Sequence, residues 1–287
     1  MCENSNGKAE APLADTFVNF RQVFNFAIAV LALAQAALAR ASDLAQEERW
    51  AEQIVEGLEN RNASWLSAGD TEFLALYSPA VGRRRAGVLL LHDIGEHPDW
   101  RQVTKPLRDH LAARGFDALA IQMPLPTHGA PPSDYAPLYD EAVERIFAGL
   151  ETLKGEGNKR IFLVGHGLGA GMAGYFLADA DSPEVAGVAL IGMSAAGTPE
   201  GFDASAAIAA LKSPVLDVVG AAEREELLQS ATARAVGAKA NRRYVQKTIA
   251  GAGHGFEGRE KELLQTVGAW LDRHAPPIKK AAPAKKR

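Results

Sequence analysis

The residues whose types and spacing could do chemistry begin with a glycine-rich stretch, residues 160–175, which reads RIFLVGHGLGAGMAGY. Residues 161–164 are apolar and β-prone, which is typical of a buried strand. Alternate glycines follow from Gly165 to Gly171, and then a run with helical spacing, so we predict a strand, a tight turn and a helix. Gly167 lies at the centre of that turn. Glycine has no hydroxyl, thiol or carboxylate, so this position cannot attack a carbon atom.

The same stretch has a second interpretation, because Gly165-x-Gly167-x-x-Ala170 fits the dinucleotide fingerprint G-x-G-x-x-G/A. That fingerprint normally opens the first βαβ unit, and an acidic residue ends the next strand about 20 residues later. Here the pattern comes late in the chain, and the next predicted strand is followed by Gly192-Met193-Ser194. A nucleotide-binding protein is therefore a lesser alternative.

A metal site is a third interpretation, because several histidines and acidic residues could lie near one sheet edge. They are His92, Asp93, Glu96, His97, His128, His166 and His254. Their spacing matches no zinc signature. The only cysteine is Cys2, which excludes an internal disulfide and a cysteine metal cluster. From the spacing we expect no metal site, and we expect no cofactor.

Short apolar strands alternate with helices around these residues. The predicted strands are residues 71–77, 87–91, 116–121, 161–164, 185–191, 214–219 and 244–249. The predicted helices are residues 43–60 with Ser42 as cap, 99–114, 139–153, the one after Gly167, 206–211, 223–236 and 259–273. This alternation predicts an α/β fold, a mainly parallel central sheet with helices on both faces.

The N-terminal part carries the pattern of a secretory signal. Arg21 precedes the apolar residues 24–39, FNFAIAVLALAQAALA, which end in an A-x-A cleavage site. We expect cleavage after Ala39, a periplasmic or secreted protein, and no stable membrane span in the mature chain. A buried or amphipathic N-terminal helix is the alternative. The net charge of −4 gives no reason to expect nucleic acid as a partner.

The sequence suggests four segments. They are an N-terminal lead with signal peptide over residues 1–39, a helical segment over 40–70, the α/β domain over 71–274 and a disordered basic tail over 275–287.

Five segments, in order, resemble the α/β-hydrolase superfamily over residues 71–273. They are LLLHDIGEHPDW, ARGFDALAIQMP, GHGLG, SPVLDVVGAAER and GAGHGF. More narrowly, GEHPDW, PLRDHL and AIQMP resemble a bacterial branch catalogued as a domain of unknown function, whose members are exported and often lack the elbow serine. The resemblance implies the α/β-hydrolase fold. GHGLG stands where the superfamily has its nucleophile elbow G-x-S-x-G, so Gly167 replaces the serine.

The resemblance also implies roles for other residues. His254 would be the general base. Glu223 would orient it, or would equally be a carboxylate favoured by the dipole at a helix N-terminus. The backbone N–H groups of Leu168 and Ile94 would form the oxyanion hole. Asp93 departs from the usual glycine, and an inward-facing carboxylate there would disfavour a developing negative charge.

We therefore expect an exported α/β-hydrolase-fold protein that lacks the usual serine-hydrolase activity and binds a small molecule or a partner protein. The alternative is an active ester or thioester hydrolase. Its nucleophile would be displaced, with Ser133 and Ser194 as candidates, or would be a water activated by His254. Asp217, inside a predicted strand, is expected to point away from the site.

Overall fold

A computed structural model describes residues 42–58, 62–82, 85–179, 184–195 and 197–276 of the 287-residue chain. The predicted signal segment and nearly all of the predicted tail lie outside these residues. The chain divides into residues 1–41 and 42–287, and the fold below is that of the second unit. Within the described part, no helix combines the length and the apolar character that crossing a membrane requires.

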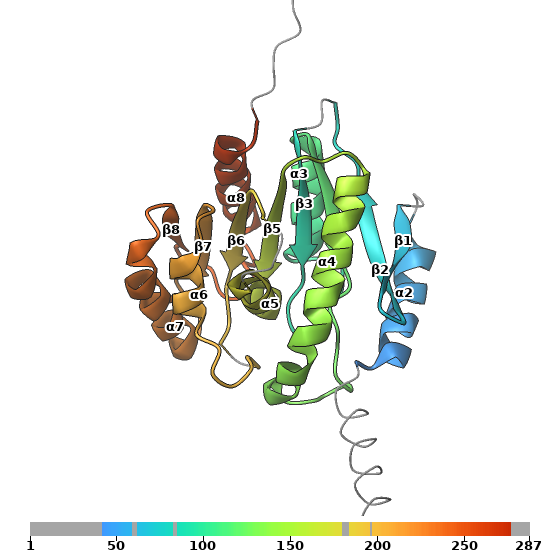
Figure 1. Ribbon diagram of the computed structural model, residues 1–287, viewed down its shortest axis with the longest axis horizontal. Coiled ribbons are helices and arrows are strands. Elements are labelled where there is room, and N and C mark those ends of the chain that lie inside the picture. Colours follow the sequence, from blue (N-terminus) through green and yellow to red (C-terminus); the bar gives the residue numbers. More distant parts are fainter. Residues whose placement is uncertain (1–41, 59–61, 83–84, 180–183, 196, 277–287) are drawn as a thin grey trace, which may run out of the picture. The chain divides into compact units, whose positions relative to one another are not determined.

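An eight-stranded sheet forms the centre of this unit (Figure 1). Its strand order is β1-β2-β4-β3-β5-β6-β7-β8. The strands are β1 (Ala63–Ala68), β2 (Thr71–Ser78), β3 (Ala86–Leu91), β4 (Phe116–Ile121), β5 (Ile161–His166), β6 (Gly187–Ile191), β7 (Val215–Gly220) and β8 (Tyr244–Ile249). β1 and β2 pair antiparallel, as do β2 and β4, and the pairings from β4 to β8 are parallel. The predicted mainly parallel sheet is confirmed.

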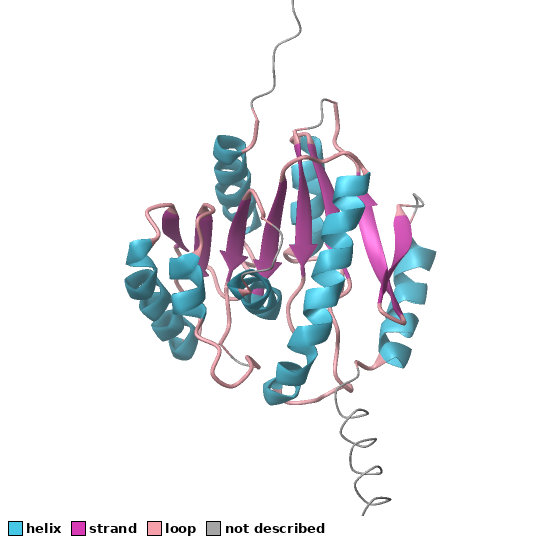
Figure 2. Cartoon of the chain, viewed as in Figure 1, coloured by secondary structure: helices cyan, strands magenta, loops and turns pink. Residues whose placement is uncertain are grey.

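Helices cover both faces of the sheet (Figure 2). They are α2 (Leu44–Gly57), α3 (Thr104–Ala113), α4 (Tyr139–Gly155), α5 (Gly167–Ala178), α6 (Ala204–Ala210), α7 (Glu225–Gly237) and α8 (Glu260–His274). Short 3-10 helices precede α4 at Pro132–Leu138 and follow α7 at Ala238–Ala240. Alternate residues of one strand face opposite layers, so Leu89 and Leu91 pack with α4 and α5, while Val88 and Leu90 pack with α3 and α8.

The N-terminal corner differs from the prediction in two respects. Residues 63–68 fall in the segment expected to be helical, but they form edge strand β1. Asp43, not Ser42, caps α2, because its carboxylate accepts a hydrogen bond from the backbone N–H of Gln46. The hydroxyl of Ser42 instead donates to Glu141.

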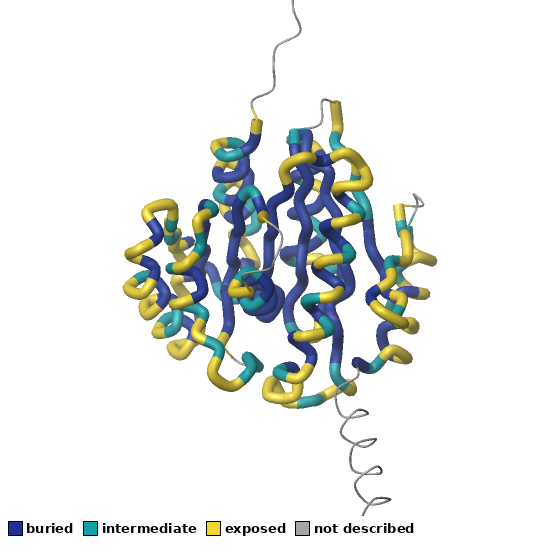
Figure 3. The backbone as a smooth tube through the Cα atoms, in the orientation of Figure 1, coloured by how far each residue is buried: buried dark blue, intermediate teal, exposed yellow. Residues whose placement is uncertain are grey.

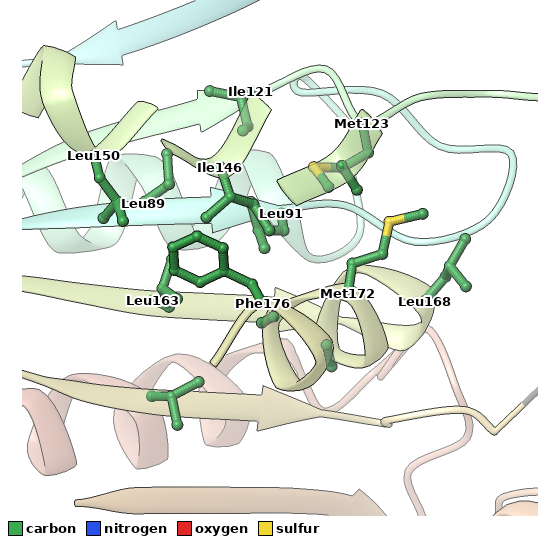
Figure 4. Close-up of a cluster of buried hydrophobic side chains, with 14 of the residues drawn as sticks. Leu89, Leu91, Ile121, Met123, Ile146, Leu150, Leu163, Leu168, Met172 and Phe176 are labelled. Carbon is green, nitrogen blue, oxygen red and sulfur yellow. The ribbon is translucent and has the colours of Figure 1, made fainter. Parts of the chain in front are cut away.

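Helix α5 is buried along most of its length (Figure 3). Its small residues allow a close approach to the sheet, and Leu168, Met172 and Phe176 project into the core beside Leu91 and Leu163 (Figure 4). This packing fixes the N-terminus of α5 against the end of β5. The end of β3 is held beside it, because Leu91 pairs with Gly165 in parallel register.

The register brings the loops after β3, β5, β6, β7 and β8 to one edge of the sheet. His166 at the end of β5 pairs with Ile191, and Gly220 at the end of β7 pairs with Ile249. The carboxyl ends of parallel strands share an edge, which is where α/β proteins place their sites. The residues singled out in the sequence lie at this edge.

Candidate functional site

The turn between β5 and α5 has glycine at three alternate positions. Gly167 has a φ of +51°, in the left-handed region that favours glycine. A Cβ on Gly165 would lie 2.6 Å from the backbone of Ala170, and a Cβ on Gly169 would lie 2.5 Å from the carbonyl oxygen of His92. The alternating glycines therefore allow α5 to begin directly against the end of β3.

The carboxylate of Asp93, in the loop after β3, occupies the space above Gly167. A Cβ on Gly167 would lie only 1.9 Å from Oδ1 of Asp93, so a larger residue at 167 cannot coexist with this carboxylate position. The same Oδ1 accepts a hydrogen bond of 2.6 Å from the backbone N–H of Leu168. Asp93 thus fills the position of the missing side chain and takes the N–H at the start of α5.

His254, in the loop after β8, bridges Asp93 and Glu223. Its Nε2 lies 2.7 Å from Oδ2 of Asp93, and its Nδ1 lies 2.9 Å from Oε1 of Glu223. The hydrogen bonds to Asp93 and Glu223 outweigh burial and raise the pKa of His254 to about 10. A carboxylate can only accept, so both ring nitrogens donate and the ring is an imidazolium.

The charge on Asp93 is stabilised in turn by its neighbours. Burial alone would raise the pKa of the Asp93 carboxyl. The hydrogen bond from His254, the charges of His166 and His254 and the N–H of Leu168 outweigh burial, and they hold that pKa below its usual value. Asp93 is therefore an ionised carboxylate that is almost entirely shielded from water, with 9% of its surface exposed.

His166 and Glu96 extend the cluster. The His166 ring stacks on the His254 ring, with 5.0 Å between centroids and 30° between planes. Nε2 of His166 lies 3.0 Å from the carbonyl oxygen of His254, and Nδ1 lies 3.3 Å from Oε2 of Glu96. That Oε2 also accepts the backbone N–H of Asp93 at 3.1 Å. Burial would lower the pKa of His166, but the Glu96 hydrogen bond and the nearby Asp93 and Glu96 charges raise it above its usual value.

The structure brings together the residues that the sequence singled out after β5, β7 and β8. Gly167, Leu168, His254 and Glu223 lie in one contact network. Ile94 is half-buried in the turn directly after Asp93 and packs on the core. The sequence does not predict the role of Glu96 in the network, because that role depends on its contact with His166, which comes from a different loop.

Other candidates have different partners. Asp217 accepts hydrogen bonds from Arg234 and Tyr244, as expected for a strand residue that points away from the site. Ser133 is exposed and its hydroxyl donates to Asp134. The backbone N–H of Ser194 contacts the carbonyl oxygen of Gly167 at 3.4 Å, so this residue lies beside the turn.

The other three histidines that the sequence offers as metal ligands lie outside this network of side chains. Nε2 of His92 accepts the backbone N–H of Met123, and burial lowers the pKa of this ring to about 3. The ring of His97 packs edge-on between those of Trp50 and Trp100. His128 is exposed.

Comparison with known proteins agrees with the fold. The sequence matches the family model described as protein of unknown function (DUF3530) over residues 21–143 and 138–273. No functionally curated protein matches the sequence.

Solved structures with the same architecture are distant in sequence. Est1E from Butyrivibrio proteoclasticus is 12% identical with a TM-score of 0.62, covering 74% of this chain and 98% of that one. The putative α/β hydrolase ATU1826 from Agrobacterium tumefaciens is 18% identical with a TM-score of 0.60, covering 75% and 100%. XC6422 from Xanthomonas campestris, an α/β serine hydrolase without a lid, is 15% identical with a TM-score of 0.61, covering 75% and 95%. At these identities the likeness shows the fold alone, which is the α/β-hydrolase fold.

Proposed function

We propose that this chain, which belongs to the DUF3530 family of proteins of unknown function and has the α/β-hydrolase fold, does not catalyse serine-type acyl transfer. In this proposal, the cluster of Asp93, Glu96, His166, Glu223 and His254, which we call the strand-end centre, is a binding site built from carboxylates and imidazoles. The observation that carries the proposal is the position of one side chain. The Asp93 carboxylate fills the space where the nucleophile would stand. It also accepts the Leu168 N–H that would serve an oxyanion hole, and it contacts Nε2 of His254, the nitrogen that would accept a proton in a general base.

The carboxylate is unfavourable for the chemistry of ester cleavage. That reaction needs backbone donors aimed at a position where negative charge develops. Here the Leu168 N–H already donates to Asp93, so an oxyanion would form against an existing negative charge. In a buried site such like-charge contacts are weakly screened and cost several kcal/mol.

The histidine is also in the wrong state to act as a base. A general base needs a ring nitrogen with a free lone pair. Both nitrogens of His254 are engaged with carboxylates, and its pKa of about 10 keeps the ring protonated at neutral pH. His254 therefore acts as a cation that holds Asp93 and Glu223 together.

An active hydrolase remains the second candidate, and one observation favours it. Asp93, His254 and Glu223 follow one another as a carboxylate, an imidazole and an acid, and carboxylates act as nucleophiles in some enzymes. Against this, Oδ1 of Asp93 is held by Leu168 and Oδ2 by His254, so neither oxygen is directed at a substrate. Displaced attack by Ser133 or Ser194, or by a water activated by His254, has no such support.

Nucleotide binding is disfavoured by the same carboxylate. A dinucleotide fingerprint places the pyrophosphate on the N–H groups at the start of the helix. The Leu168 N–H at that position donates to Asp93, whose charge would repel a phosphate.

An ester panel tests the proposal. We expect purified protein and its His254→Ala variant to hydrolyse short p-nitrophenyl esters and thioesters at the same background rate. A wild-type turnover that His254→Ala abolishes would show a working hydrolase. If Asp93 were the nucleophile, its attack on the ester would release the alcohol and leave a mixed anhydride. Under single-turnover conditions in H₂¹⁸O, attack of water on the Asp93 carbonyl of that anhydride would place the label in Asp93.

We also propose that the protein is exported. The support is the sequence of residues 24–39, an apolar run after Arg21 that ends in Ala37-Leu38-Ala39. These residues lie outside the described structure. N-terminal sequencing of protein from the native host is expected to begin at Arg40, and a cytoplasmic chain that begins earlier would contradict export.

A further inference from the structure

We infer that Asp93, His166 and His254, with Glu96 beside them, form a binding site for a divalent transition-metal ion such as Zn²⁺. The inference rests on the proposed function, since it names the ligand of the same strand-end centre. It departs from the expectation, based on spacing, that the chain holds no metal. A spacing argument would not detect such a site, because the candidate ligands come from the separate loops after β3, β5 and β8.

The geometry gathers three metal-binding side chains around one point. One ligand atom from each of Asp93, His166 and His254 lies within 4.8 Å of the other two. Nε2 of His254 faces Oδ2 of Asp93 at 2.7 Å. Zinc–ligand bonds of about 2.0–2.2 Å place tetrahedral ligand atoms about 3.3 Å apart. Binding of an ion therefore requires Oδ2 of Asp93 and Nε2 of His254 to move apart.

One nitrogen of each histidine ring, His254 and His166, has a hydrogen-bond partner that fixes the orientation of the ring. A metal-bound histidine almost always donates its second N–H to a carboxylate or a carbonyl oxygen. Nδ1 of His254 has Glu223 as that partner at 2.9 Å. Nε2 of His166 has the carbonyl oxygen of His254 at 3.0 Å. The other nitrogen of each ring faces a carboxylate, Nε2 of His254 toward Asp93 and Nδ1 of His166 toward Glu96, and a metal ion would replace the proton at these contacts.

The contact between His166 and Glu96 is an independent observation that points to a cation. Because a carbonyl oxygen only accepts, Nε2 of His166 must carry a hydrogen. Nδ1 then faces Oε2 of Glu96 at 3.3 Å, where a lone pair and a carboxylate oxygen would repel each other. A positive charge is needed at this contact: a proton on Nδ1 supplies it in the metal-free protein, and a bound metal ion would take the place of that proton.

The charge of the site supports the same conclusion. Asp93, Glu96 and Glu223 are each less than 10% exposed. Among the described residues, the basic side chains within salt-bridge distance of these three carboxylates are the two histidines, and none is a lysine or an arginine. Buried carboxylates are normally paired or coordinate metals.

The donor set selects the class of metal. Imidazole nitrogens suit Zn²⁺ and other late first-row ions, whereas Mg²⁺ and Ca²⁺ prefer sites made of oxygen alone. Two imidazoles with one or two carboxylates fit a four-coordinate zinc site. His254 is the most exposed of these side chains, at 29%, so an ion would enter along its side of the site.

The test is titration of ZnCl₂ into chelator-treated, full-length protein by calorimetry, with MgCl₂ as the hard-cation comparison. We expect one Zn²⁺ per chain and no saturable Mg²⁺ binding. His254→Ala and Asp93→Asn are expected to weaken Zn²⁺ binding by at least about 100-fold, and Glu223→Gln by about 10- to 100-fold, as for outer partners of other sites. His128→Ala, which removes an exposed imidazole away from the cluster, is the matched control and should bind as wild type.

Two results would overturn the inference. One is wild-type protein that binds less than a tenth of an equivalent of Zn²⁺. The other is an equal loss of binding in His128→Ala and His254→Ala, which would show adventitious binding to surface histidines. Circular dichroism on each variant identifies any that do not fold. If a variant does not fold, a Co²⁺ spectrum of the wild-type protein still tests the site. Co²⁺ added to wild-type protein should give the visible absorption of a low-symmetry site, displaced by Zn²⁺, whereas the spectrum of hydrated Co²⁺ would contradict the site.

The ester panel on the same preparations separates this inference from the proposed function. Protein that binds no Zn²⁺ and cleaves no ester refutes the metal site and leaves the non-hydrolytic assignment intact. Ester cleavage that depends on His254 in metal-free protein refutes the non-hydrolytic assignment, whatever the zinc titration shows.

Discussion

Two buried ionic clusters in this protein are built around different cations. At the N-terminal corner, the guanidinium of Arg145 on α4 is fully buried and bonds to both oxygens of Glu47 at 2.7 and 3.2 Å and to Glu141 at 2.5 Å. At the strand ends, carboxylates surround the imidazoles of His166 and His254.

The difference lies in what each cation can do. A guanidinium stays charged, offers only donors and has no lone pair for a ligand, so the Arg145 cluster can only hold α2 and α4 together. An imidazole can lose a proton and bind a metal ion through the nitrogen that is freed. The comparison therefore favours a structural role for the first cluster and supports the binding role that we propose for the second.

The largest expected effect is a gain of esterase activity on replacing Asp93 and Gly167, the two residues in which the strand-end centre departs from a serine hydrolase. In Gly167→Ser alone, the new side chain would overlap the Asp93 carboxylate, so we expect no esterase activity. The double variant Asp93→Gly with Gly167→Ser removes the overlap and frees the Leu168 N–H and His254 Nε2. We expect p-nitrophenyl acetate turnover about 100-fold or more above wild type, in the range that acid–base catalysis contributes.

A triple variant that also carries His254→Ala is the control for that gain and should return to background. If Gly167→Ser alone were as active as the double variant, with both well above background, Asp93 would not block the site. The comparison between the clusters would then lose its central observation.

Replacing Arg145 with methionine should cause the largest loss of stability. Methionine fills much of the same volume but leaves the Glu47 carboxylate buried without its cation. Removing one partner of a buried pair typically costs about 3–5 kcal/mol. Urea unfolding should show this loss, whereas Lys154→Met, which removes an exposed pair with Glu151, should change the free energy of unfolding by about 0–1 kcal/mol. A loss below that of the control variant would refute the structural role.

Asp93→Asn should destabilise the metal-free protein less than Arg145→Met does. The Asn side chain still accepts the Leu168 N–H, and His254 can release a proton, so no unpaired charge has to stay buried. We expect a loss of about 1.5–3 kcal/mol by urea unfolding, the size of a charged hydrogen bond. If the loss equalled that of Arg145→Met, the two clusters would not differ in the way proposed.

The sequence predicted the parallel part of the fold well, for a physical reason. β3, β4, β5 and β7 are buried at every position, and most of their residues are apolar, as expected for parallel strands covered on both faces. β4 and β8 begin and end where they were predicted. β1, with sequence ASWLSA, was missed because it is a half-exposed edge strand with little apolar pattern, and its Trp65 is 50% exposed.

The site could be predicted only in part. The order of motifs along the chain placed Gly167, His254 and Glu223 at one edge of the sheet, since each follows a strand of a parallel array. It could not show that Asp93 fills the space above Gly167, because that depends on the direction of a side chain 74 residues away. Along the sequence, the missing serine and the added carboxylate are two separate departures from the superfamily pattern. In the structure they are one change, since the first makes room for the second.

The smallest expected effect sharpens the comparison at the N-terminal corner. Asp43 caps α2 through the Gln46 N–H, and its own backbone N–H donates to Leu125, a bond that alanine would keep. Asp43→Ala should therefore cost only the cap, about 1 kcal/mol, in urea unfolding. Glu48→Ala, at an exposed position of the same helix, is the matched control and should be nearly neutral. If Asp43→Ala cost as much as Arg145→Met, both changes would act by releasing α2, and the stability assigned to the Arg145 ion pairs would belong to the docking of that helix.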